Sequence, residues 1–223
     1  KVGNARNLLT KFQSVEYITT QNFDRRAFEA INCISVVPGA TGAWKKSSVL
    51  RIGGYCGETL TEDADLTLTL VEDGGKVVYA PEAVSSTEAP ETLRDLYQQR
   101  FRWSFGIYQS LWKHRRSFFT GSLGWIALPN MLIFQLFWPL LSPIGDLVFL
   151  YALVTGNAHA IVVGYTTFLL LDVAASVVAF SLDKEPYRAM WPILIQRFYY
   201  RQFMYIVTFR TVLAALAGRR HAW

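Results

Sequence analysis

Two short motifs hold the side chains best suited to chemistry. They are Thr61-Glu62-Asp63 and, further along the chain, Gln99-Arg100-Phe101-Arg102-Trp103. Gln99, Arg102 and Trp103 are spaced i, i+3 and i+4, so on a helix they share one face. An amide, a guanidinium and an indole suit a ligand with an anionic end and a sugar end, because arginine forks onto phosphate oxygens and indole covers a pyranose ring. A carboxylate facing this helix could accept a proton from an attacking hydroxyl.

Each motif also has an ordinary structural explanation. Thr61 is a good helix N-cap, and acidic residues at positions 62, 63 and 65 compensate the helix dipole in a first turn. Many helices carry a glutamine, an arginine and a tryptophan without binding a ligand. The two motifs indicate a binding site only together, in this order and ahead of an apolar tract.

The elements that must position these motifs alternate between predicted strands and helices. Short β-branched segments at 33–37 and 77–80 predict buried strands, and each ends at a proline. Helices are expected from Thr61 to Gly74 and from Pro90 onward. Residues 6–32 have mostly helical spacing, with a break near 21–24. Strands alternating with helices predict an α/β layer.

A long apolar tract follows this layer. From Phe118 to Phe180 the only formal charges are Asp146 and Asp172. A bilayer-spanning helix needs about 20 apolar residues. The sequence therefore predicts a soluble module over 1–117 and membrane helices over 118–223.

The number of membrane spans stays open at this point. Crossings at 123–154, 160–180 and 192–217 would place Arg219-Arg220 outside, against the positive-inside rule. Splitting the first tract or laying it in the interface gives an even number, which we prefer. Arg197 and Arg201 in the last stretch fit either the membrane interface or a cavity.

Basic residues gather just before the apolar tract, within a net charge of +5. This cluster fits a cytoplasmic flank, and it could also hold lipid headgroups or a diphosphate. No nucleic-acid motif accompanies it, so no nucleic-acid partner is expected. The two cysteines and three histidines lack metal-site spacing. The basic cluster consists of Arg94, Arg100, Arg102, Lys113, Arg115 and Arg116. The cysteines are Cys33 and Cys56, and the histidines are His114, His159 and His221.

Taken together, the chain resembles the second half of the catalytic domain of processive family-2 glycosyltransferases, the synthases of cellulose, chitin, hyaluronan and poly-N-acetylglucosamine. Residues 61–63 match their TED motif, and residues 99–103 match their QxxRW motif. Residues 38–46, followed by Gly53-Gly54-Tyr55, resemble the segment that helps form the acceptor site. The resemblance runs from about 35 to 116 and implies the C-terminal half of a GT-A nucleotide-diphospho-sugar transferase domain.

The resemblance also implies roles for individual residues. Asp63 is the expected general base of an inverting displacement from a UDP-sugar. Arg102 and Gln99 are expected at the diphosphate, beside a divalent metal (Mg or Mn), and Trp103 at the acceptor sugar. Glu62 and Thr61 are expected to bind substrate next to the base. Two further residues have weaker assignments: Trp44 to acceptor contact or core packing, and Asp65 to helix capping.

One part of the family pattern is not found. Neither a uridine-binding aspartate nor a metal-binding DxD precedes Thr61. The metal ligands are therefore expected mostly outside this chain, which alone is expected to be inactive.

Segment 6–32 resembles the poly-N-acetylglucosamine and chitin-type branch. This implies UDP-N-acetylglucosamine as donor and a growing β-linked polysaccharide as acceptor, exported through the helices of a multi-pass protein in the lipid bilayer of the inner (plasma) membrane, with the catalytic part cytosolic. Two alternatives remain open: a non-processive family-2 transferase, and a non-catalytic membrane scaffold.

Overall fold

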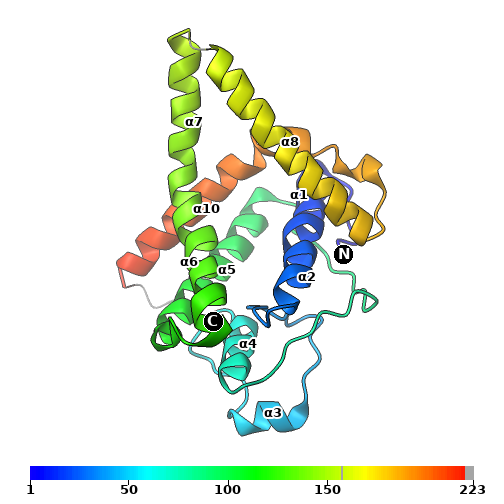
Figure 1. Cartoon of the computed structure of the whole chain (residues 1–223), viewed down its shortest axis with the longest axis vertical. Helices are drawn as coiled ribbons and strands as arrows, with labels where there is room; N and C mark the ends of the chain where they lie inside the picture. The colour runs from blue at the N-terminus through cyan, green and yellow to red at the C-terminus, as the bar shows by residue number, and fades with distance from the viewer. Residues whose placement is uncertain (157, 219–223) are drawn as a thin grey trace.

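The computed structural model describes residues 1–156 and 158–218, and its regular elements there are helical (Figure 1). The first half holds α1 (Leu8–Glu16), a π-helical segment (Tyr17–Asn22), α2 (Phe23–Glu29), α3 (Lys46–Arg51), α4 (Glu62–Glu72) and α5 (Leu93–Lys113). Short 3-10 turns lie at Arg115–Ser117 and Tyr187–Met190. The second half holds π-helical Leu123–Ala127, α6 (Leu128–Leu132), π-helical Ile133–Phe137, α7 (Trp138–Val154), α8 (Ala158–Leu182), α9 (Ile193–Gln196) and α10 (Tyr200–Leu216).

The first helical run begins at a local signal. Asn7 caps α1 because its Oδ1 accepts from the Thr10 N–H at 2.8 Å, while the Thr10 hydroxyl accepts from the Asn7 N–H. The break expected near 21–24 is wrong. The chain instead passes through the π-helical segment Tyr17–Asn22 directly into α2, so the run stays helical to Glu29.

The predicted strands are not formed. Residues 33–38 and 76–80 have no regular structure, and the only β-type contact of the described part of the chain is an isolated bridge between Val2 and Thr87. A strand needs a ladder to a neighbouring backbone. Here the Val37 N–H donates to the Thr67 hydroxyl, and the Val77 N–H donates to the Asn32 side chain, both at 3.0 Å. These side-chain bonds replace a ladder, and the α/β layer is not confirmed.

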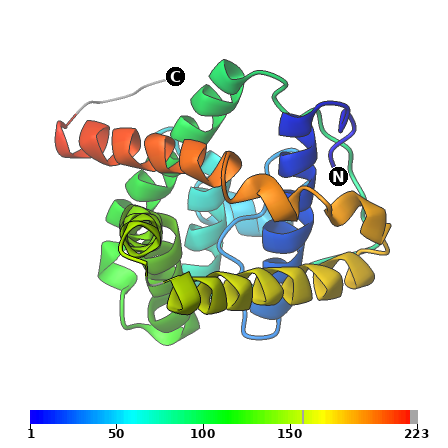
Figure 2. The ribbon, with the colours of Figure 1, turned by 90° about the horizontal axis from the view of Figure 1, so that it is seen from above.

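α5 is the central element, because helices from both halves of the chain pack on it. α4 and α6 lie against it in the largest apolar core, which contains Leu68, Leu111 and Met131. α1 and α10 reach it through Phe12, Leu96 and Tyr200. Seen from above, α7 is end-on, while α8 and α10 run across the molecule (Figure 2). α5 therefore contacts α10 and α6 of the second half, and α4 contacts the Leu123–Ala127 segment.

α7 and α8 project from this body and converge at their far ends (Figure 1). The helical run Leu123–Val154 has 32 residues and Val162–Leu182 has 21, and both are apolar enough to cross a membrane. A core helix of a soluble protein meets the same criteria, but it would be mostly buried, whereas only 0% and 11% of the residues are buried in the 18-residue apolar windows of these two helices. Pro143 lies inside α7 without ending it.

The third apolar stretch, 192–217, is divided between α9 and α10. Neither passes the test for a membrane span. α10 packs along α5 and carries Arg201 and Arg210. The expectations that concern Arg219, Arg220 and His221 lie outside the described residues.

Candidate active site

Asp63 lies in the first turn of α4, where backbone N–H groups hold its carboxylate. Its Oδ2 accepts from the Gly39 N–H at 3.0 Å, and its Oδ1 accepts from the Ala64 N–H at 2.8 Å. Thr61 occupies the N-cap position, but its side chain makes no capping bond. The carboxylate is thus oriented by the turn at Pro38–Thr41 and by its own helix, and it is half-buried.

Gln99, Arg102 and Trp103 lie on α5, which Thr92 caps by accepting from the Asp95 N–H at 3.1 Å. The Gln99 Oε1 is buried without a hydrogen-bond partner among the described residues. Arg102 is exposed, and Trp103 is half-buried with the Arg100 guanidinium 4.4 Å from its ring centre. The shared face predicted from their spacing is present, because all three line one cavity.

This cavity has a volume of about 1640 Å³ and is lined from both halves of the chain. Its walls come from the segment 16–28, the turn 38–41, the start of α4, α5 and several later helices. Six of the seven predicted site residues line it: Thr61, Glu62, Asp63, Gln99, Arg102 and Trp103. Trp44 does not line it. A Cβ on Gly42 would lie 3.2 Å from the Trp44 Nε1, so this indole packs on its own loop.

A close contact fixes the start of α4 against α5. A Cβ on Gly106 would lie 2.6 Å from the Thr61 backbone nitrogen and from its hydroxyl oxygen, which is closer than real atoms approach. The Leu60 N–H donates to the Gln109 Oε1 at 2.8 Å in the same region. Only glycine allows this approach, which brings the turn carrying Asp63 next to the helix carrying Trp103.

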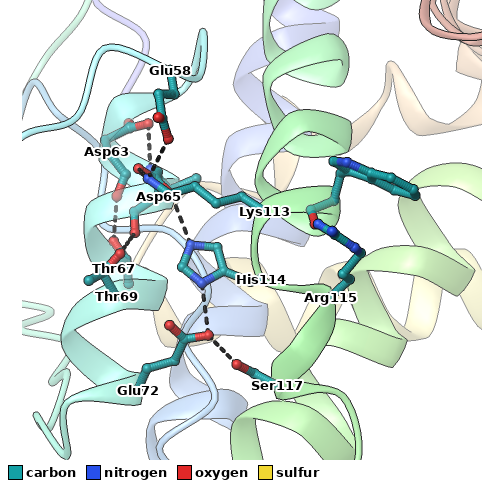
Figure 3. A network of polar contacts seen from close by, with 12 residues as sticks. Glu58, Asp63, Asp65, Thr67, Thr69, Glu72, Lys113, His114, Arg115 and Ser117 are labelled. Atoms are coloured by element: carbon teal, nitrogen blue, oxygen red, sulfur yellow. Dashed lines mark hydrogen bonds and ion pairs between the residues drawn. The ribbon is translucent and has the colours of Figure 1, made fainter.

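An ionic network centred on the buried Asp65 and His114 joins the two helices again and extends from the first turn of α4 to its last residue (Figure 3). The His114 ring contacts Asp65 at 2.9 Å and Glu72 at 2.8 Å, and the Lys113 ammonium contacts Asp65 at 2.8 Å. The Ser117 hydroxyl donates to Glu72. Asp65 is 1% exposed and His114 is 5% exposed. We call these five residues the α4–α5 clamp.

The clamp is held by charge. Burial disfavours the imidazolium, but the hydrogen bonds with Asp65 and Glu72 outweigh it and raise the pKa of His114 to about 9. Burial likewise opposes ionisation of Asp65 and Glu72, but hydrogen bonds from His114, Lys113 and Ser117 place the pKa of each carboxyl below its ordinary value. At neutral pH a cationic imidazole therefore bridges two carboxylates.

The sequence had given other roles to these residues. Asp65 was assigned to helix capping, and that assignment is wrong, since its carboxylate binds His114 and Lys113. The available signal was the seven-residue spacing of Asp65 and Glu72, which places both on one side of α4 after two turns. Nothing in the sequence pairs them with His114.

Arg100, assigned to the basic flank, is also used inside the protein. It is 4% exposed and pairs with Glu16 at 2.8 Å, while donating to the Tyr200 hydroxyl at 3.2 Å. These contacts join α1, α5 and α10 behind Trp103.

The described residues contain no group of three or more His, Cys, Asp or Glu side chains that could hold a metal ion. The divalent metal implied by the resemblance has no ligand set among them.

Comparison with known proteins decides the family. Residues 2–182 match the family described as Glycosyl transferase family group 2. The chain belongs to this family. The matched region includes α1 to α8 but not α10, and the family-2 membership inferred from the motifs is confirmed.

Two curated relatives show the extent of the similarity. The chain is 29% identical over 120 residues to the poly-beta-1,6-N-acetyl-D-glucosamine synthase of Staphylococcus aureus (strain COL), which is 54% of this chain and 28% of the relative. It is 29% identical over 118 residues to the probable glycosyltransferase YdaM of Bacillus subtilis (strain 168), which is 53% of this chain and 28% of that relative. The chain thus spans little more than a quarter of the length of either. No solved structure matches it significantly.

Proposed function

We propose that this chain forms part of an inverting membrane glycosyltransferase that extends a β-linked polysaccharide from a UDP-sugar. The observation that carries the proposal is that Asp63 and the Gln99, Arg102 and Trp103 face line one cavity. Family membership supports sugar transfer, and the name of the Staphylococcus aureus relative supports N-acetylglucosamine as the sugar.

Asp63 serves as the general base in this proposal. Its carboxylate takes the proton from the acceptor hydroxyl as that oxygen bonds to the anomeric carbon of the donor. The bond from the anomeric carbon to the diphosphate oxygen breaks in the same step, and UDP leaves with the electron pair. A single displacement inverts the anomeric carbon. The N–H groups of Gly39 and Ala64 keep the carboxylate aimed, and the first turn of α4 favours its negative charge.

The face of α5 that carries Gln99, Arg102 and Trp103 binds both the donor and the acceptor. Arg102 and the Gln99 amide bind the diphosphate, where negative charge builds as the bond breaks. The Trp103 ring forms a floor for the acceptor sugar, with the Arg100 guanidinium beneath it at 4.4 Å. Thr61 and Glu62 line the cavity beside the base and contact the acceptor end.

The later helices supply the membrane part. α7 and α8 lie in the bilayer, with residues 1–117 as the cytosolic catalytic part and 118–223 as the membrane region. The cavity extends to Trp138 and Ser142 on α7 and to Tyr205 on α10, polar or aromatic side chains suited to a sugar chain. We propose that the polymer leaves the site past these residues, which makes synthesis processive.

Transfer assays on the complete protein test this function. UDP-N-acetylglucosamine, UDP-glucose and UDP-glucuronate are supplied separately, and product length is measured. We expect polymer from UDP-N-acetylglucosamine, and a loss on the order of 10²–10⁴-fold in rate for Asp63→Asn. Asp73→Asn, at the exposed far end of the same helix, is the matched control. Sole use of UDP-glucose would reject UDP-N-acetylglucosamine as the donor. Products with a single added sugar would reject processive synthesis, and an unchanged rate in Asp63→Asn would reject Asp63 as the general base.

A further inference from the structure

Two adjacent arginines on α2 have different environments. Arg26 donates to the Asp183 carboxylate at 3.0 Å and to the Leu182 carbonyl at 3.3 Å, and its guanidinium lies 5.1 Å from the Tyr79 ring centre. Arg25 makes no hydrogen bond or ion pair with any residue in 1–156 or 158–218. Both line the cavity. Arg26 fastens α2 to the end of α8, whereas the charge of Arg25 is left available to the cavity.

The surroundings of Arg25 do not neutralise it. Its charge is influenced by two carboxylates, Asp63 and Asp24, and by the phenols of Tyr17 and Tyr79. Burial disfavours the charged guanidinium more than these groups favour it, and the pKa of Arg25 falls below its ordinary value. Arginine nevertheless stays protonated. A half-buried cation without a partner is unfavourable for the protein alone, and an anionic ligand would remove that cost.

The start of α2, which carries Arg25 in the cavity wall, is anchored to Asp183 by the residues before and after Arg25. Before it, the Asn22 amide donates to Asp183 at 2.6 Å, and after it Arg26 binds the same carboxylate. The preceding π-helical segment packs on α8 and lines the cavity with Tyr17, Thr20 and Gln21. Rare π-helical turns are often found at functional sites. Arg25 therefore projects from an anchored wall of the cavity, on a different helix from Arg102.

We propose that Arg25 binds the phosphate oxygens of the donor diphosphate, as a second guanidinium besides Arg102. This inference rests on the proposed function for the identity of the diphosphate. A guanidinium fork matches phosphate oxygens in two-point contact. Arg25 and the proposed base Asp63 line the same cavity. The anomeric carbon reacts between base and leaving diphosphate, so Arg25 stabilises the charge that the departing UDP gains.

Binding measurements on the complete protein test this role. Affinities for UDP and for inorganic pyrophosphate are measured by calorimetry on Arg25→Gln, Arg25→Lys and Arg26→Gln, together with the Tm of each. A hydrogen bond to a charged group predicts that Arg25→Gln weakens both affinities roughly tenfold or more. Its Tm stays equal or rises, because an unpaired charge is removed. Arg25→Lys gives an intermediate affinity, since the charge stays but the fork is lost.

Arg26→Gln is the matched control, with the same change at the next position of the same helix. It should lower the Tm, because the Asp183 contact is lost, and keep both affinities close to those of the wild type. Wild-type affinities in Arg25→Gln, or no binding of either anion by the wild type, would overturn the role of Arg25. Arg25-dependent anion binding in a protein that transfers no sugar would support the site and reject the transferase function. Normal sugar transfer, together with anion binding that does not depend on Arg25, would support the transferase function and reject the role of Arg25.

Discussion

The α4–α5 junction and the α7–α8 pair are stabilised by opposite means. At the junction, the charged side chains of His114 and Asp65 are buried and paired, and His114 also contacts the partly exposed Glu72. Along α7 and α8 the side chains are apolar and exposed, with Ile144 56% and Val154 87% accessible. The first region satisfies its groups within the protein. The second packs on the rest of the protein along part of its length, as at Phe180, and leaves many of its apolar side chains exposed.

This difference shows what each region requires from its surroundings. A buried ion network is specific in geometry and sensitive to the loss of any member. An exposed apolar helix is stable only where water is replaced by an apolar medium, as in a bilayer. The junction can therefore fix the positions of Asp63 and Trp103 relative to each other, while the helix pair responds to the medium around it.

Removing His114 should give the largest effect on the junction. His114→Ala leaves Asp65 buried and without one of its two cationic partners, and breaking a buried ion pair costs about 3–5 kcal/mol. Denaturant unfolding of the complete protein measures this. The control is Arg51→Ala, which removes an exposed pair with Asp73 and costs about 1 kcal/mol or less. Equal losses in the two variants would mean that the clamp is no stronger than a surface pair.

A charge placed on α7 should show whether this helix lies in a bilayer or in water. Ile144→Arg places a cation in the middle of an apolar helix, at a cost of about 2.5–3.5 kcal/mol if that helix lies in a bilayer. The fraction of protein retained in membranes after alkaline extraction is the readout. Leu50→Arg on α3, at a site 67% exposed, is the same kind of change and should be neutral within about 0.5 kcal/mol. Identical behaviour of the two variants would place α7 in water.

The clamp should also make stability depend on pH. The pKa of His114 is about 9 in the folded protein, against 6.5 ordinarily, so the folded state binds the proton more tightly. The stabilisation is complete below about pH 6.5 and is lost as the pH rises through 9, a decline of roughly 3 kcal/mol at most. Asp65 and Glu72, with lowered pKa values, add stability that is lost in acid. Unfolding from pH 5 to 9.5 measures the decline, and a flat wild-type profile would contradict it. His114→Gln should show no such decline.

Overpacking the helix contact should give the smallest change in stability. Gly106→Ala forces a methyl group against the Thr61 backbone, and overpacking costs about 1–3 kcal/mol. Because α4 must shift, the transfer rate should fall as well. Gly39→Ala is the control, since its Cβ would lie 3.7 Å from the Asp63 Cβ, an ordinary contact. A loss of activity in Gly39→Ala but not in Gly106→Ala would show that the helix contact does not position the base.

The sequence by itself determined the local elements and the motif faces. Thr61 and Gly74 bracket α4, and the spacing of Gln99, Arg102 and Trp103 put them on one side of α5, because helix signals act within a few residues. The family followed from the same motifs. The apolar length of α7 and α8 was likewise readable, since it depends on composition alone.

Only the tertiary structure decided the contacts between distant segments. Residues 33–37 and 77–80 looked like strands because burial and β-branching are shared by strands and core loops, and a ladder depends on a partner that their own residues do not specify. His114 meets Asp65 across 49 positions. Arg25 and Arg26 look identical in sequence, but only Arg26 reaches Asp183, at a separation of 157 positions. Such pairings depend on how helices pack, which no local pattern records.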